Sequence, residues 1–383
     1  MDKIASLIDL AHRCMSSASS SFRWRRLYTD ACLIWSLAYI AYSSVLEQPM
    51  LLQCINMLDR AIIVAGAPGE GRLDLVLLCI HNIQNTYLPL RSFERATPRP
   101  PSSLSACSLE ASSETIPCIQ SPPSFASFKH SHSHGPFILR GYVQHWPSAN
   151  ERPWASDAYL QSVAGPGRIV PIEVGKDYRR DDWTQKMMNW DDFLTTTGSP
   201  EGGEVVYLAQ HDIMKQFPAL RDDIIIPDYV YAALPPPESF PQYKPPVNDE
   251  ELVINAWFGP AGTESPAHTD PFFNLYAQVV GRKTVWLCPP SATGSMYAYP
   301  PAESNSHHNP AANTTEPSMS NTSQVDVFAS REDGIQKHPE FWGNAVPHAL
   351  SATLQSGDLL FFPPGWWHAM RSEEKSFSVS MWF

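Results

Sequence analysis

The sequence has few of the features that mark secreted or nucleic-acid-binding proteins. Its seven cysteines are scattered through 383 residues without a Cys-x-x-Cys pair, so a disulfide framework is not expected. It has no block of Lys and Arg, and 27 basic against 39 acidic residues give a net charge of −12, which argues against a nucleic-acid partner. An acidic surface instead suits a basic protein substrate.

Long apolar runs are also missing. The N-terminal segment, residues 1–17, lacks the uninterrupted apolar core of a signal peptide and is better explained as an amphipathic helix. The most apolar run, residues 31–45, contains Ser and Tyr and is too short to span a bilayer comfortably. The composition therefore predicts a soluble intracellular protein without a membrane partner.

Residues 1–95 are expected to form a helical N-terminal domain. Apolar residues recur there at helical spacing, and short loops between helices indicate antiparallel helix pairs. Such a domain can bind a partner protein or can pack against the rest of the chain as a support, and the sequence favours neither. The expected helices cover residues 4–16, 24–46, 48–65 and 72–87.

Residues 96–134 are rich in Pro and Ser and are expected to form a disordered linker, because they cannot bury enough apolar area to fold. His130, His132 and His134 alternate near its end. A flexible tract lacks the neighbours that fix the orientation of metal ligands, so a solvated tract is favoured over a metal site.

Residues 135–383 carry short β-rich runs separated by Gly- and Pro-rich turns, which predicts a mainly β sandwich or jelly roll. Two runs, 275–280 and 283–287, flank Gly281-Arg282 and are expected to form a hairpin. Residues 235–246 and 298–320 are expected insertions, the second a loop at the mouth of a site. The other expected strands are 137–142, 168–174, 205–209, 253–258, 358–362, 366–370 and 377–382, with helices at 190–195 and 212–217.

Two residues in one extended segment suggest a metal site. His268 and Asp270 are two positions apart, so their side chains project to the same side of the chain. An imidazole beside a carboxylate supplies two of the three ligands of the 2-His-1-carboxylate triad that binds non-haem Fe(II). The second histidine must come from a distant strand, and His368 is the candidate.

Lys283 follows in the same region and shares a strand face with Val285 and Leu287. A lysine on an apolar face is costly unless its ammonium meets an anion. The alternative is that Lys283 lies at the strand end and extends to water. Fifteen residues after a His-x-Asp pair, the anion site is favoured.

Residues 255–283 closely resemble the JmjC domains of 2-oxoglutarate oxygenases, in particular the small group typified by lysine demethylase 8. The resemblance covers roughly residues 135–383 and implies a double-stranded β-helix of the cupin type, with Fe(II), 2-oxoglutarate and O₂ as its cofactors. Other matching stretches are residues 136–148, 170–183, 207–213, 226–230, 321–327, 363–369 and 377–383.

The resemblance also implies roles for individual residues. His268, Asp270 and His368 would hold Fe(II), and Lys283 would pair with the distal carboxylate of 2-oxoglutarate. The remaining residues that it implies for the cosubstrate pocket are Tyr207, Ser265, Asn274 and Trp382.

The resembling group has been associated with two reactions, histone N-methyl-lysine demethylation and arginine hydroxylation in proteins. Because no zinc-finger reader module is recognisable in the sequence, hydroxylation of an arginine-type side chain in a basic protein is favoured, with demethylation as the alternative. Glu173, alone in an apolar strand, is expected to face the cavity and bind the guanidinium; a structural Arg or Lys partner is the alternative.

Two other kinds of site are disfavoured. A non-catalytic JmjC scaffold would not need all three ligands and the cosubstrate lysine. A structural zinc site would close four positions with Cys and His. The resemblance favours a nuclear location, with the cytoplasm as the alternative.

Overall fold

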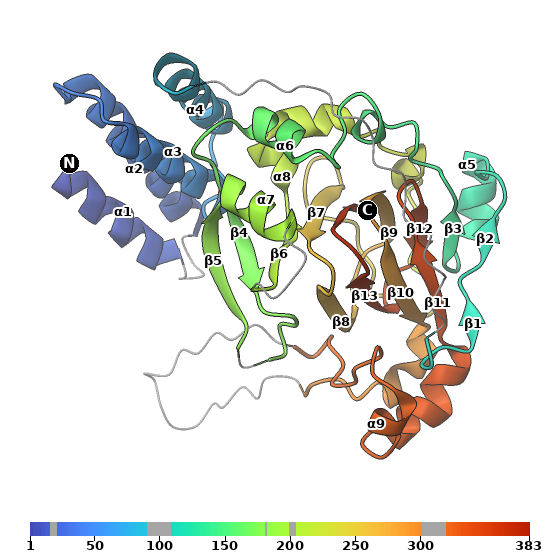
Figure 1. Ribbon diagram of the computed structural model, residues 1–383. Helices are drawn as coiled ribbons and strands as arrows, with labels where there is room; N and C mark the ends of the chain where they lie inside the picture. The colour runs from blue at the N-terminus through green and yellow to red at the C-terminus, as the bar shows by residue number, and fades with distance from the viewer. Residues whose placement is uncertain (16–20, 90–108, 181, 199–203, 301–318) are drawn as a thin grey trace.

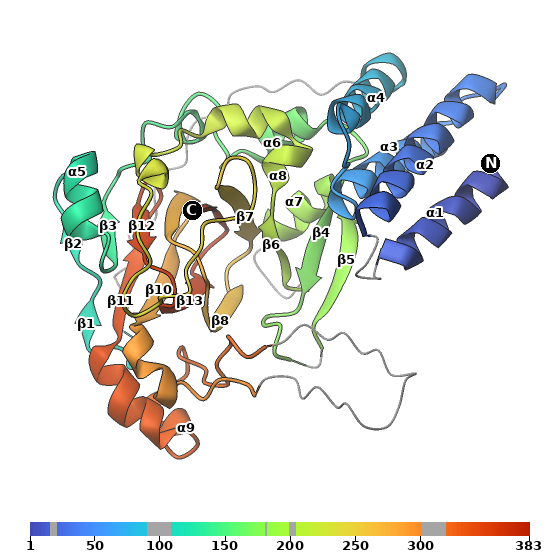
Figure 2. The same cartoon turned by 180° about the vertical axis from the view of Figure 1, so that it is seen from behind.

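The computed structural model describes residues 1–15, 21–89, 109–180, 182–198, 204–300 and 319–383. A group of N-terminal helices lies at one end of a β-rich body, and the views from the front and from behind agree on this arrangement (Figures 1 and 2). No helix within the described ranges is both long and apolar enough to cross a membrane.

The N-terminal region is helical, as predicted. Its helices are α1 (Asp2–Met15), α2 (Ser21–Tyr42), α3 (Gln48–Ile63) and α4 (Arg72–Tyr87). They form a hydrophobic core of their own, in which Cys54, Ile55 and Leu58 of α3 are fully buried. The apolar spacing read from the sequence is therefore the spacing that packs α3 between α2 and α4.

A buried polar network joins α3 to the β-rich body. The carboxylate of Asp59, which is 0% exposed, accepts hydrogen bonds from the guanidinium of Arg168 at 2.7–3.0 Å and from the backbone nitrogen of Ile169 at 2.9 Å. The Nε2 atom of Gln216 donates to the same carboxylate at 2.8 Å. Since Ile169 begins β4, this network fixes the helices against that strand.

The expected disorder of the linker is wrong for residues 109–134, which are ordered; residues 96–108 lie outside the described ranges. This segment contains β1 (Glu114–Thr115), β2 (Cys118–Ile119), α5 (Phe125–Ser127) and a π-helical turn (Phe128–His132). Phe128 is fully buried and packs against Phe361 with ring centroids 5.1 Å apart. Buried apolar residues, among them Ile116 and Phe128, therefore anchor a tract that is otherwise rich in polar residues.

Two sheets form the body. The five-stranded sheet has the order β1-β11-β10-β13-β8, and the nine-stranded sheet has the order β2-β3-β12-β9-β14-β7-β6-β4-β5. Their inner faces share a core to which Tyr276 and Leu360 contribute from one sheet and Val285 and Met370 from the other. This confirms the expected cupin-like double-stranded β-helix.

The strand bounds place the predicted runs in the two sheets. The nine-stranded sheet contains, besides β2, the strands β3 (Phe137–Leu139), β4 (Ile169–Val174), β5 (Thr184–Asn189), β6 (Val206–His211), β7 (Val253–Gly259), β9 (Asn274–Val280), β12 (Leu359–Phe362) and β14 (Ser376–Trp382). The five-stranded sheet contains, besides β1, the strands β8 (Glu264–Thr269), β10 (Lys283–Cys288), β11 (Leu350–Leu354) and β13 (Trp367–Ser372). Short helices connect them, namely α6 (Asp157–Ala164), α7 (Trp190–Gly198), α8 (Ile213–Gln216) and α9 (Arg331–Ile335).

The predicted hairpin at Gly281-Arg282 is wrong. β9 pairs with β12 and β14, whereas β10 pairs with β11 and β13, so the two strands belong to different sheets. Gly281 has φ +74°, and a Cβ atom there would lie 2.1 Å from the backbone oxygen of Lys375. The turn therefore carries the chain from one sheet to the other, and it puts Asn274 and Lys283 on facing sheets.

Candidate metal centre and cosubstrate pocket

Three side chains converge where β8 and β13 lie side by side. His268 of β8 is paired directly with His368 of β13, and Asp270 follows the end of β8. The Nε2 atom of His368 is 3.4 Å from Oδ2 of Asp270, and Nε2 of His268 is 4.0 Å from its Oδ1. In the described part of the chain, no other group of three or more His, Cys, Asp or Glu side chains is arranged to hold a metal ion.

Backbone carbonyls orient the two imidazoles in the same way. Nδ1 of His268 lies 2.8 Å from the oxygen of Pro266, and Nδ1 of His368 lies 3.1 Å from the oxygen of Trp366. A carbonyl can only accept a hydrogen bond, so both Nδ1 atoms carry a proton, and in the neutral form of each ring the lone pair is on Nε2, which faces the centre. Such outer contacts are typical of histidines that bind a metal.

The protonation of the centre also suits a cation. Burial, together with the adjacent His368, lowers the pKa of His268 to about 4, so this imidazole is neutral at pH 7. Burial opposes ionisation of Asp270, but the adjacent His368 and His268 lower its pKa overall. Two imidazoles and one carboxylate are the donor set of a non-haem Fe(II) site with open positions, and not that of a closed four-ligand zinc site.

Lys283 lies in the interior of the double-stranded β-helix. It is 1% exposed, and its Nζ atom donates to the hydroxyl oxygens of Tyr207 at 3.0 Å and Tyr276 at 2.9 Å. Burial lowers its pKa to about 7, and no carboxylate in the described ranges forms an ion pair with it. The alternative of a lysine that extends to water is therefore wrong. A buried ammonium without a counter-ion fits a carboxylate ligand.

A narrow pocket opens beside the three metal-ligand candidates. Two of the residues that the sequence analysis assigned to the cosubstrate, Ser265 and Asn274, lie in its wall. Tyr207 is not in the wall itself, but its side chain accepts a hydrogen bond from Lys283 and is hydrogen-bonded to Ser265 of the wall. The pocket is lined by Trp257, Ser265, His268, Asp270, Asn274, Tyr276, His368, Met370 and Ser380.

Unpartnered polar atoms lie next to this pocket. Oδ1 of Asn274 and Nε1 of Trp382 are buried, and neither has a hydrogen-bond partner among the described residues. Trp382 is the direct cross-strand neighbour of Asn274, so their side chains share a sheet face. Buried polar groups are rarely left unsatisfied. The pair therefore fits a site that is completed by a polar ligand such as 2-oxoglutarate.

Five residues of this interior were not predicted from the sequence. Trp257, Tyr276, Met370 and Ser380 line the pocket, and Nδ2 of Asn255 is buried without a partner among the described residues. A signal was present, because Ser376, Ser378 and Ser380 alternate along β14, which is buried on both faces. Regular polar alternation in a fully buried strand indicates a polar cavity on one side.

Glu173 lies in β4 directly opposite Tyr207 of β6, so its side chain shares the sheet face from which Tyr207 reaches Lys283. The indole nitrogen of Trp183 donates to its Oε2 atom at 3.3 Å, and burial raises its pKa. No Arg or Lys in the described ranges forms an ion pair with it. Glu173 is not in the wall of the pocket beside the three metal-ligand candidates, and its substrate role stays a prediction.

Comparisons with known proteins agree with this geometry. Residues 122–383 match the Cupin-like domain family. The chain is 34% identical over 367 residues to a lysine-specific demethylase 8 of Danio rerio, a match that spans 94% of this chain and 81% of that protein. It is 37% identical over 257 residues to a Jumonji C domain-containing protein 5 of Drosophila melanogaster, across 65% of this chain and 54% of that protein. The chain therefore belongs to the cupin-like JmjC family of 2-oxoglutarate-dependent oxygenases, whose members use Fe(II), 2-oxoglutarate and O₂.

Proposed function

We propose that this enzyme oxidises a carbon atom near the cationic nitrogen of a lysine or arginine side chain in a basic protein substrate. The observation that carries this proposal is the convergence of His268, Asp270 and His368 beside a pocket. The wall of this pocket includes Tyr276, which accepts a hydrogen bond from the buried ammonium of Lys283. With Fe(II) and 2-oxoglutarate bound, such a centre couples conversion of 2-oxoglutarate to succinate and CO₂ with oxidation of a C–H bond.

The chain's own residues then have distinct tasks. His268 and His368 are held in place by backbone carbonyls, so their Nε2 atoms are preorganised for the metal. Lys283 offers a cation, and Tyr207 and Tyr276 offer hydroxyl groups, to the distal carboxylate of 2-oxoglutarate. Because Ser265 and Asn274 lie in the same pocket wall, they are the proposed donors that orient the cosubstrate relative to the metal.

Demethylation of N-methyl-lysine is the first candidate reaction. The relatives from Danio rerio and Arabidopsis thaliana carry the name lysine-specific demethylase. Oxidation of an N-methyl carbon gives a hemiaminal, which breaks down to the free amine and formaldehyde. The net charge of −12 favours a basic substrate such as a histone tail, and that substrate would place the enzyme in the nucleus.

Hydroxylation of an arginine side chain is the second candidate, and Glu173 favours it. This half-buried carboxylate lies on the sheet face of Tyr207 and is bonded to the indole of Trp183 rather than to a structural cation in the described ranges. A carboxylate beside an aromatic ring suits a planar guanidinium, which can donate hydrogen bonds to the carboxylate and stack on the ring.

The helices α1–α4 are proposed to support the catalytic body and to offer a surface to a partner protein. The Asp59–Arg168 network favours the supporting role. Exposed apolar side chains on α2, Ile34 and Leu37, favour the partner role.

One experiment separates these candidates. The full chain would be incubated with Fe(II), 2-oxoglutarate and air, and with paired peptides that contain either N-methyl-lysine or unmodified arginine. Mass spectrometry would detect loss of a methylene mass or gain of an oxygen mass, and a formaldehyde assay would run in parallel. The variant His268→Ala is the control and should give neither product. Succinate production without any peptide product would contradict both substrates, and absence of succinate would contradict catalysis altogether.

A further inference from the structure

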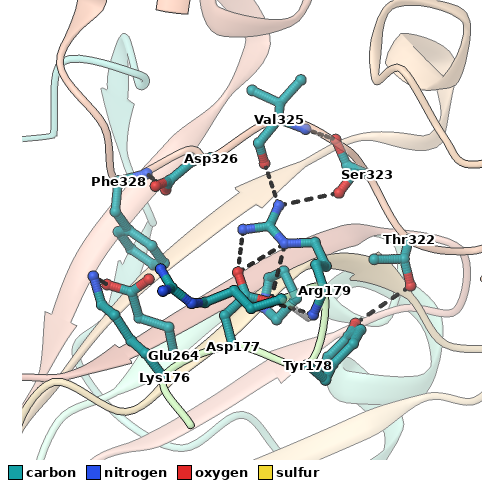
Figure 3. Close-up of polar contacts among 12 residues, drawn as sticks. Lys176, Asp177, Tyr178, Arg179, Glu264, Thr322, Ser323, Val325, Asp326 and Phe328 are labelled. Atoms are coloured by element: carbon teal, nitrogen blue, oxygen red, sulfur yellow. Dashed lines mark hydrogen bonds and ion pairs between the residues drawn. The ribbon is translucent and has the colours of Figure 1, made fainter. Parts of the chain in front are cut away.

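The loop between β4 and β5 touches a distant part of the chain beside the metal centre. Residues 176–179, here called the clasp loop, contact residues 321–325, here called the outer segment (Figure 3). Neither segment supplies one of the three metal-ligand candidates. Both segments, however, contact β8, the strand that carries His268.

The outer segment runs along the free edge of β8. The backbone nitrogen of Ser323 donates to the oxygen of Ala267 at 2.8 Å, and the nitrogen of Thr269 donates to the oxygen of Asn321 at 2.9 Å. Thr322 is thereby the antiparallel partner of His268. His268 is thus held between His368 on one side and Thr322 on the other.

Arg179 joins the clasp loop to the outer segment. Its Nη1 atom donates to the backbone oxygen of Ser323 at 3.1 Å and to that of Val325 at 3.0 Å. Asp177 fixes the guanidinium from the other side, since its Oδ2 atom accepts from Nε of Arg179 at 2.8 Å and also from Nη2. Tyr178 adds a side-chain contact, with its hydroxyl 3.3 Å from Oγ1 of Thr322.

The clasp loop is also tied to β8 itself. The backbone nitrogen of Glu264 donates to the oxygen of Lys176 at 3.3 Å, and the side chains of these two residues form an ion pair at 3.1 Å. One short loop therefore bridges the start of β8 and the segment that covers its edge. Figure 3 shows Arg179 between Asp177 and the two carbonyls.

The Arg179 contact is more than a surface ion pair. The side chains of Arg179 and Asp177 are only 12% and 9% exposed, whereas those of the neighbouring pair Arg180 and Asp182 are 57% and 63% exposed. A guanidinium holds several donors in one plane, so it can bind a carboxylate and two carbonyls at once. A lysine at this position has a single nitrogen and cannot reproduce that geometry.

We propose that Arg179 is a positioning residue for the metal centre. It holds the outer segment against β8 and so fixes the backbone on which His268 is mounted. This inference rests on the metal role of His268 in the proposed function, but it is independent of which protein side chain is oxidised.

The test compares Arg179→Ala with the matched control Arg180→Ala in the full chain. Amide hydrogen exchange of Ser323 and Thr269 reports directly on the two backbone bonds between the outer segment and β8. Titration with Mn(II), which does not require turnover, reports on the metal centre. We expect faster exchange at both amides and a loss of Mn(II) affinity on the order of 10-fold in Arg179→Ala, because outer contacts of metal ligands commonly have effects of this size. Arg180→Ala should match the unmodified protein.

A more conservative variant keeps the proposal testable if Arg179→Ala does not fold. Arg179→Lys keeps the charge and should still accelerate exchange at Ser323 and weaken Mn(II) binding, although less than the alanine variant. Unchanged Mn(II) affinity in a folded Arg179 variant would overturn the proposal, whether or not exchange changes. Failure of the unmodified protein to bind Mn(II) would instead overturn the metal role of His268, so the two failures are distinguishable.

Discussion

The Nζ atom of Lys283 lies 2.9 Å from the hydroxyl oxygen of Tyr276, and this contact joins the five-stranded sheet to the nine-stranded sheet across the interior. Tyr207 accepts a second hydrogen bond from the same ammonium at 3.0 Å. An ammonium has three donors, so one donor is left for a ligand that enters between the sheets. A dicarboxylate that binds this ammonium at one end and a metal at the other would fit the arrangement.

Substitution of Lys283 should weaken the binding of 2-oxoglutarate. Lys283→Ala removes the cation proposed to pair with the distal carboxylate, and loss of one partner of a buried pair typically costs about 3–5 kcal/mol. Lys283→Arg should also bind poorly, because the planar fork does not fit a site shaped for an ammonium. Calorimetric titration of the Mn(II)-loaded protein measures the effect, with the exposed Lys186→Ala as a control. Equal affinity in all variants would show that the carboxylate binds elsewhere.

The affinity for 2-oxoglutarate should depend on pH above neutrality. Burial lowers the pKa of Lys283 to about 7 in the ligand-free protein, and a carboxylate binds only its protonated form. Affinity should therefore fall as pH rises above about 7, approaching a tenfold loss per pH unit by linkage. Conversely, the free energy of unfolding of the ligand-free protein should rise over the same range, because the unfolded chain keeps a proton that the folded chain has released.

Titrations at several pH values between neutrality and the alkaline range check this dependence. The variant Lys283→Met should lose it. His268 does not interfere, since its pKa of about 4 leaves it neutral throughout. A pH-independent affinity in the unmodified protein would rule out Lys283 as the titrating group.

Glu173→Gln should separate substrate binding from cosubstrate turnover. The amide keeps the shape of the side chain but loses the charge that would bind a cationic substrate, so peptide oxidation should fall strongly. Conversion of 2-oxoglutarate to succinate without peptide should persist, because Glu173 is not in the wall of the pocket beside the metal-ligand candidates. Both rates can be followed in the same reaction. The exposed carboxylate Glu204, paired with Lys186 at 2.7 Å, gives the control variant Glu204→Gln. Loss of uncoupled turnover in Glu173→Gln would contradict a substrate role.

Asp59→Asn should destabilise the whole chain. Asp59 is 0% exposed and Arg168 is 5% exposed, so the substitution leaves a buried guanidinium without its counter-ion. The expected loss is about 3–5 kcal/mol in the free energy of unfolding. Asp30→Asn is the control. It breaks the pair between Asp30 of α2 and Arg72 of α4, whose side chains are about one third exposed, so the free energy of unfolding should fall by only about 0–1 kcal/mol. Urea denaturation of both variants measures the difference. Equal losses in the free energy of unfolding would show that the network does not stabilise the contact between the helices and β4.

The sequence predicts the parts of the site that depend only on the geometry of one short segment. Alternation along an extended chain is enough to place His268 and Asp270 on one side. The need for a third ligand from a distant strand made His368 the candidate, and the resemblance implied its role. The hairpin prediction failed because a Gly-containing turn between two β-rich runs is equally compatible with a crossing between sheets. What decides between them is the pairing of each strand with β11 to β14, far away in the sequence.

Other misses have similar causes. β5 was not predicted because its residues are exposed or half-buried and show no alternation, and its place is set by pairing with β4. The linker prediction weighed the Pro and Ser content of residues 96–134 and overlooked Phe128, whose ring is fully buried. The unpaired atoms of Asn255 and Trp382 could not be foreseen, because burial without a partner is a property of the assembled sheets.

The crossing at Gly281 sets a limit on changes in chain length. Asn274 begins β9 and Lys283 begins β10, so the two residues lie on facing sheets and are joined by β9 and the turn at Gly281. Side chains alternate with a period of two, so one inserted or deleted residue after Gly281 would turn Lys283 away from the interior and slip β10 against both of its neighbours. Proteins that keep the cosubstrate lysine are therefore expected to keep this spacing fixed, while they tolerate insertions and deletions in connections such as residues 235–246, where no strand register has to be preserved.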